Sequence, residues 1–339
     1  MSNFFYKRKL NVYHLTGHCS LTSQSYGVLW PETLTGRTGN DIASSVVLLL
    51  NKLLTDNTVE HITLWSDSCI PQNRNKVLST ALMLLIESSE HLKSIVQKFG
   101  EPGHSEVQEV DNLHSQIDRV MQHAEVYSPV GLVRILKNVP RGKPIKLVQM
   151  KACDVKDFHE EAELFDFECI PFSKVKSIRY SSTAPMTLEY KTCFAEAWQA
   201  QVIKPKARTR SSASCIETVV FKKPKQSAKA QLNHISAEKA KDIASMLKFM
   251  PEQDRLYMSI ICRAFDCSQA SASTSGETSE PCRGTQSGRM ETGNKAGSTT
   301  VKACKKTSAA AVAADTGKIT VAPAAETRKK RETRKKTYF

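Results

Sequence analysis

The chain has no apolar run of transmembrane length, and its start, Asn3–Arg8, is too short and too charged for a signal peptide. Its ten cysteines show no paired metal-ligand spacing, because Cys262 and Cys267 have no second Cys or His pair nearby. These absences argue against membrane-spanning, secreted disulfide-rich and zinc-ribbon proteins. They predict an intracellular protein with free thiols and no membrane partner.

Large apolar side chains are scarce in 268–325, which is rich in Ser, Thr, Gly and Ala. A segment of this kind cannot bury enough surface to offset its conformational entropy. The sequence therefore predicts a disordered basic tail over 267–339. Before it, apolar residues recur at helical spacing in Ala237–Phe249 and Leu256–Phe265, which predicts a helical extension over 232–266.

Acidic residues are few in the two most basic segments. The net charge is +14, yet residues 1–203 hold 21 Lys and Arg against 22 Asp and Glu. The excess lies in 204–230, with +7, and in 302–339, with +8. We predict a basic linker over 204–231 and non-specific, salt-sensitive binding of nucleic acid. The predicted binding residues are Lys204, Lys206, Arg208, Arg210, Lys222, Lys223, Arg328, Lys329, Lys330 and Arg331.

The basic run Arg328–Lys336 also resembles a nuclear import signal. Two interpretations are open, because short basic runs also arise by chance at the ends of chains. The first interpretation predicts a nuclear protein.

Asp67 is the first candidate site residue. The run His61–Trp65 is predicted to be a strand, and Asp67 follows it, where open α/β sheets bind ligands. A polar loop and a helix over 75–87 come next. The alternative is a turn residue whose carboxylate accepts bonds from nearby backbone N–H groups.

A second polar cluster lies in the segment that is predicted to be a helix over 111–121. Asp111, His114, Ser115 and Asp118 are three, four and seven residues apart, so we expect them to share one helix face able to bind a metal. The alternative is a solvated face, with Asp111 near the positive end of the helix dipole. Both interpretations stay open from the sequence.

Four pieces of the chain resemble a family of uncharacterised, transposon-derived proteins found in animal genomes. They are Phe5–Tyr13, Trp65–Cys69 with Gln72–Asn75, Gly103–Ser105, and Asp111–Arg119. The resemblance covers about Phe4 to Ile203 and continues weakly to Tyr257. Its specific part is the spacing Asp-x-Cys-x-x-Gln-Asn-Arg-Asn, which begins at Asp67.

The resemblance implies a fold like ribonuclease H, the scaffold of transposases and integrases. In that scaffold carboxylates from the first strand, the fourth strand and a late helix hold two Mg²⁺ or Mn²⁺ ions that cleave or join phosphodiesters. Asp67 matches the fourth-strand carboxylate, Asp111 or Asp118 would match the helical one, and His104 would be a neighbouring ligand. A Cys–His hydrolase using Cys69 and His104 is a further interpretation without an orienting third group.

The chain departs from the family at the first-strand carboxylate, because Glu32 is the only acidic residue among the first forty. We therefore predict an α/β domain over 1–203 with a ribonuclease H-like mixed sheet that lacks its central strand, and no catalysis. Lys9–Thr16 should pair antiparallel with Tyr26–Trp30. It should not pair with His61–Trp65, which leaves a slot or a substituted strand between them. An Asp-bearing strand encoded upstream would instead restore a two-metal nuclease or strand transferase.

Overall fold

The computed structural model describes residues 6–100, 109–139, 142–206, 235–273 and 312–322, with backbone only for 264–273 and 312–322. Its strands form a nine-stranded mixed sheet of order β5-β2-β1-β11-β3-β4-β7-β8-β9, and β6 and β10 form a separate pair. The strands are β1 Leu10–Cys19, β2 Gln24–Pro31, β3 His61–Ser66, β4 Ser94–Phe99, β5 Lys146–Gln149, β6 Phe165–Asp166, β7 Ser177–Ser181, β8 Thr187–Lys191, β9 Gln199–Val202, β10 Lys204–Pro205 and β11 Val312–Ala322.

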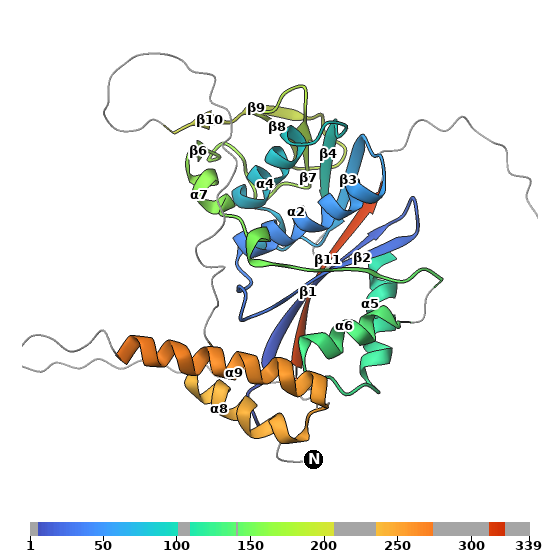
Figure 1. Ribbon diagram of the computed structural model, residues 1–339. Helices are drawn as coiled ribbons and strands as arrows, with labels where there is room; N and C mark the ends of the chain where they lie inside the picture. Colours follow the sequence, from blue (N-terminus) through green and yellow to red (C-terminus); the bar gives the residue numbers. More distant parts are fainter. Residues whose placement is uncertain (1–5, 101–108, 140–141, 207–234, 274–311, 323–339) are drawn as a thin grey trace, which may run out of the picture.

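The centre of the sheet confirms the predicted pairing. β1 and β2 form an antiparallel hairpin, with Thr16 opposite Gly27. In the described part of the chain β1 and β3 do not pair, because β11 lies between them (Figure 1). β11 runs parallel to β1 over ten residues and antiparallel to β3 over four.

The strand β11 corrects the prediction of a wholly disordered tail over 267–339, and α9, which ends at Ser273, also extends into that range. The segment has few large apolar side chains, which is why its composition predicts disorder. A central strand, however, is held on both sides by backbone ladders, which do not depend on side-chain hydrophobicity. Composition alone therefore misses it.

Helices cover both faces of the sheet. Alternate residues of β1 point to opposite faces: Leu15 belongs to the core cluster under α2 and α4, and Val12 to the cluster under α5 and α6. Among the described residues no helix has the length and apolar character needed to cross a membrane. The helices are α2 Gly39–Asp56, α3 Ile70–Asn73, α4 Lys76–Glu87, α5 Glu109–Met121, α6 Pro129–Lys137, α7 Phe158–Glu163, α8 Ala237–Met246 and α9 Glu252–Ser273, with short 3₁₀ turns η1 Ala152–Asp154 and η3 Leu247–Phe249.

The two long helices of the main core begin at polar caps. Thr38 and Asp41 form a capping box at the start of α2. The side chain of Asn75 accepts a 2.9 Å bond from the backbone N–H of Leu78 at the start of α4. Every residue of α4 from Val77 to Ile86 is buried, which explains its continuous apolar run.

The segment 142–203, within the predicted 1–203 domain, adds strands to the same sheet. It supplies strands at both edges: β5 pairs parallel with β2, and β7, β8 and β9 continue the sheet antiparallel from β4. These later strands extend the sheet beyond β2 on one side and beyond β4 on the other.

The predicted helical extension forms a hairpin of α8 and α9 that packs at the start of β1 (Figure 1). Leu10 is fully buried there among Ile243, Met246 and Met258. The buried carboxylate of Asp254 accepts a 2.9 Å bond from Arg134 on α6. The extension is therefore part of the same packed body.

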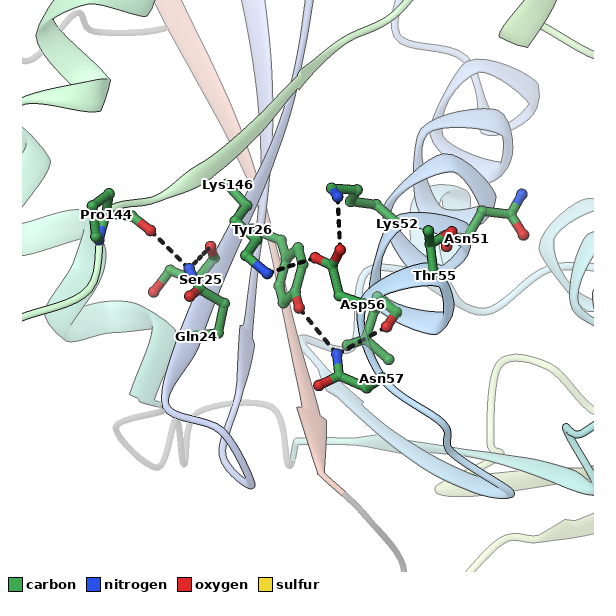
Figure 2. Close-up of polar contacts among 11 residues, drawn as sticks. Gln24, Ser25, Tyr26, Asn51, Lys52, Thr55, Asp56, Asn57, Pro144 and Lys146 are labelled. Carbon is green, nitrogen blue, oxygen red and sulfur yellow. Dashed lines mark hydrogen bonds and ion pairs between the residues drawn. The ribbon is translucent and has the colours of Figure 1, made fainter.

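Figure 2 shows how the β2–β5 edge is tied to the end of α2. The carboxylate of Asp56 binds Lys146 of β5 at 2.8 Å and Lys52 of its own helix at 2.7 Å. Next to it the side chain of Asn57 donates to the hydroxyl of Tyr26, at 3.2 Å. The bonds from Lys146 and Lys52 hold the pKa of Asp56 below its ordinary value.

We expect Asp56→Asn to lower the free energy of unfolding by about 1 kcal/mol at neutral pH, because it removes the charge that joins two lysines. The contribution should disappear as the pH falls through the carboxyl range, since the pKa of the folded carboxyl is the lower one. Urea unfolding measures both effects. Glu60→Gln, which breaks the surface pair with Lys93, is the control and should leave stability unchanged. Equal losses in the two variants would contradict the assigned role of Asp56.

Candidate functional site

Asp67 lies directly after β3 and is exposed. Its Oδ1 atom accepts a short hydrogen bond from the Nδ2 group of Asn73 and a 3.5 Å bond from the backbone N–H of Cys69. These contacts close the loop that leads from β3 into α3. They are the contacts expected of the turn residue that the sequence left open as an alternative.

The rest of the Asp-x-Cys-x-x-Gln-Asn-Arg-Asn motif also builds this connection. Arg74 is buried and donates to the carbonyl oxygens of Ser68 at 2.8 Å and Val175 at 3.1 Å. Its guanidinium lies over the ring of Phe99, 5.6 Å from the ring centre. Burial lowers the pKa of Arg74. The motif thus anchors the β3–α4 connection to β4 and to the segment before β7.

The face of α5 differs from the prediction. His114 is buried with Val110, Leu113 and Ile117, whereas Asp118 and Ser115 are exposed. Asp111 is half-buried. The four predicted residues therefore do not form one solvent-facing surface, because the apolar stripe of α5 turns His114 toward the sheet.

His114 joins a buried polar group that we call the histidine layer: His14, Thr16 and His18 on β1, Ser25 on β2, and His114 on α5. The Nε2 atom of His114 lies 2.6 Å from the hydroxyl of Thr16. The Nδ1 atom of His18 lies 3.1 Å from the hydroxyl of Ser25. All five residues are buried. Residues 14, 16 and 18 share this face because they alternate along one strand.

The outer end of the histidine layer meets Glu109, at the start of α5. The carboxylate of Glu109 lies 3.6 Å from the Nε2 atom of His18 and accepts a short hydrogen bond from Ser20. The arrangement Ser25–His18–Glu109 contains the groups of a nucleophilic triad, but Ser25 is only 1% exposed. A nucleophile closed off in this way cannot reach a substrate.

His14 is the most constrained member of the layer. Within the described residues its Nε2 atom is buried without a hydrogen-bond partner. Gly27 makes room for the ring, because a Cβ atom there would lie 2.7 Å from that nitrogen. Burial, and then the nearby His114, lower the pKa of His14 to about 3. His14 is therefore neutral at physiological pH.

This low pKa predicts a loss of stability in acid. In the unfolded chain the pKa of His14 returns to about 6.5, so its contribution is complete above that pH and decreases as the pH falls toward 3. Between pH 7 and about 4.5 we expect this group to remove roughly 2.5 kcal/mol of unfolding free energy. Urea unfolding of wild type and His14→Leu at both pH values measures it.

The leucine variant should lose less stability in acid than wild type does. The control is His91→Gln, at an exposed histidine, which should follow wild type at both pH values. If His14→Leu and wild type lose the same stability between the two pH values, His14 is not the acid-sensitive group.

The predicted metal ligands do not assemble in the described residues: no group there of three or more His, Cys, Asp or Glu side chains could hold a metal ion. His104, the fourth predicted ligand and the partner proposed for Cys69, lies outside the described residues. The metal site therefore remains a prediction from the sequence.

Two of the predicted nucleic-acid-binding residues are described. Lys204 is exposed on β10. Lys206 lies 3.4 Å from the carboxylate of Glu163, which also binds Lys76 at 2.6 Å. Glu163 therefore compensates part of the charge of Lys206. The remaining eight lie outside the described residues: Arg208, Arg210, Lys222, Lys223, Arg328, Lys329, Lys330 and Arg331.

Sequence reasoning missed the histidine layer. Its signal was the alternation of His14, Thr16 and His18 in a predicted strand, which is three polar residues on one face. Comparisons with protein-family models, curated proteins and solved structures find no match to the chain.

Proposed function

We propose that the chain is a transposon-derived, non-catalytic protein that binds nucleic acid through its two basic segments. The observation that carries the proposal is the distribution of charge. Residues 1–203 hold 21 basic against 22 acidic residues, whereas 204–230 and 302–339 carry +7 and +8. A protein that holds nucleic acid in a groove of its fold concentrates basic charge on that fold.

Paired charges on the described fold support this proposal. Several of its lysines and arginines bind carboxylates of the same fold, as Lys146 binds Asp56, Arg179 binds Glu189 and Lys239 binds Glu32. Such pairs leave less charge for phosphate. Contacts between the basic segments and phosphates would be independent of base sequence and sensitive to salt.

The order of elements supports a ribonuclease H-like origin for the scaffold. A hairpin of β1 and β2, then α2, then the parallel β3–α4–β4 unit follow the order expected of that fold after its first strand. In the ribonuclease H arrangement a strand lies between the counterparts of β1 and β3, and here β11 occupies that place. Its direction differs, since a first strand would run antiparallel to β1.

The residues present do not fit the two-metal site of that fold. The Oδ1 atom of Asp67 is engaged by Asn73 and by the N–H of Cys69. On the central strand Lys318 pairs with Thr16, and its neighbour Ile319 pairs with Ser66, the residue before Asp67. A lysine thus stands in the register where a first-strand carboxylate would be needed. These observations support the non-catalytic proposal over the nuclease alternative.

Binding to duplex DNA with and without the basic charges tests the proposal. The basic segments should account for nearly all of the affinity, and Mg²⁺ or Mn²⁺ should produce no cleavage of the bound DNA. Metal-dependent cleavage that Asp67→Asn abolishes would favour the nuclease. The basic run Arg328–Lys336 resembles an import signal, and import into the nucleus would bring the protein to nucleic acid.

A further inference from the structure

In the described structure β11 fills a central slot between β1 and β3. The two strands run antiparallel to each other with one strand between them, so the inserted strand is parallel to one and antiparallel to the other. Without it, two rows of backbone N–H and C=O groups inside the sheet would have no partner. The slot is therefore a binding site for an extended strand.

Backbone pairing of this kind does not depend on which chain supplies the strand. β11 pairs with ten residues of β1 and four of β3, and four of its eleven residues are Ala or Gly. Main-chain hydrogen bonds provide most of the attraction when an extended segment is added to a sheet. An identical segment from another molecule would make the same ladders.

The connection to the rest of the chain permits such an exchange. Thirty-eight residues, 274–311, separate the end of α9 from β11. At about 3.3 Å per residue they could span roughly 125 Å, several times the radius of gyration of about 18 Å expected for a domain of this size. A strand on a tether of that length can reach the slot of a neighbouring molecule.

We propose that the central slot takes the Val312–Ala322 strand of a second copy of the chain in exchange for its own. The product is a dimer in which each sheet is completed by its partner. A connection of thirty-eight residues corresponds to an effective concentration of the order of millimolar for the strand of the same molecule. Exchange therefore becomes extensive only when the protein itself approaches that concentration.

The first test is refolding of the full chain from urea at about 10 µM and at about 1 mM, followed by light scattering on the eluting species. We expect a dimer whose fraction increases at least tenfold with concentration. In Thr320→Pro the dimer should be absent, because Thr320 pairs with both β1 and β3 and proline removes its N–H. Thr320→Val keeps the N–H and should dimerise like wild type. Equal dimerisation by the proline variant, or a monomeric wild type at both concentrations, would overturn the proposal.

The second test uses a labelled peptide of residues 312–322 and fluorescence anisotropy. The peptide should bind the Thr320→Pro chain at least about 30-fold more tightly than wild type, whose own strand competes at the tether's effective concentration. If Thr320→Pro does not fold alone, the peptide should restore its cooperative unfolding transition. A peptide that itself carries the proline is the control. Absence of both binding and restoration would exclude a strand-receiving slot.

Discussion

Replacing sixteen basic residues of the segments 204–230 and 302–339 with glutamine should lower affinity for duplex DNA at least about 1,000-fold at 50 mM salt. Each phosphate contact releases a condensed counterion, so affinity depends steeply on the number of cationic side chains. The sixteen residues to replace are Arg208, Arg210, Lys222, Lys223, Lys225, Lys229, Lys302, Lys305, Lys306, Arg328, Lys329, Lys330, Arg331, Arg334, Lys335 and Lys336. Lys318 is kept, because it belongs to β11.

The control variant changes five exposed basic residues of the fold to glutamine: Arg119, Lys137, Lys143, Lys151 and Lys174. It should lose less than about threefold in affinity, because the proposal gives the fold no continuous phosphate-binding surface. Circular dichroism should show both variants folded. If the control loses as much affinity per residue as the sixteen-residue variant, the binding surface lies on the fold.

Thr320→Pro should strongly lower the stability of the fold. Thr320 pairs with His18 of β1 and with Trp65 of β3, so its N–H belongs to a ladder on whichever side it points. Proline removes that bond from the middle of a sheet, where it is rarely tolerated, and we expect a loss of about 3 kcal/mol or more. In thermal unfolding this corresponds to a decrease of roughly 6–12 °C in the midpoint.

Two matched variants separate strand breaking from other effects of the substitution. Thr320→Val retains the N–H and β-branching, and it should stay within about 1 kcal/mol of wild type. Ser308→Pro places the same residue four positions before β11 and should leave the midpoint unchanged. A midpoint for Thr320→Pro equal to that of Ser308→Pro would mean that β11 does not hold the sheet together.

The elements that local periodicity specifies were predicted well. The strand His61–Ser66 and the helix Lys76–Glu87 lie within a residue of their predicted bounds. Each has an apolar pattern or a cap that is complete within its own segment. The helices α8 and α9 of the extension were predicted for the same reason, from apolar residues at helical spacing on either side of Pro251.

The central strand could not be predicted in this way. The slot follows from the pairing expected of β1, but the identity of its occupant depends on a ladder between residues about 300 positions apart, such as Leu10 and Val312. Val312–Ala322 carries three large aliphatic side chains, Val312, Ile319 and Val321, in a region otherwise rich in Ser, Thr and Ala. Backbone pairing with two neighbouring strands depends on the tertiary fold, and it places little constraint on the amino-acid composition of the strand.

For Asp67 the sequence left two roles open, a site residue and a turn residue, and its contacts are those of a turn residue. The sequence predicted the polar loop after β3. In the structure, hydrogen bonds of Asp67, Asn73 and Arg74 close this loop. Helical spacing alone could not tell that His114 faces the sheet, because that depends on which neighbour α5 packs against. Residues three and four apart share a helix face, but a residue at the border of that face, such as His114, can instead belong to the neighbouring apolar stripe.

The salt dependence of DNA binding tests most directly the claim that the basic segments, and not a groove on the fold, hold nucleic acid. Affinities of the full chain and the sixteen-residue variant should be measured between about 50 and 200 mM salt. We expect a slope of log affinity against log salt of about −5 or steeper for wild type, and near zero for the variant. A variant that keeps the wild-type slope would contradict it.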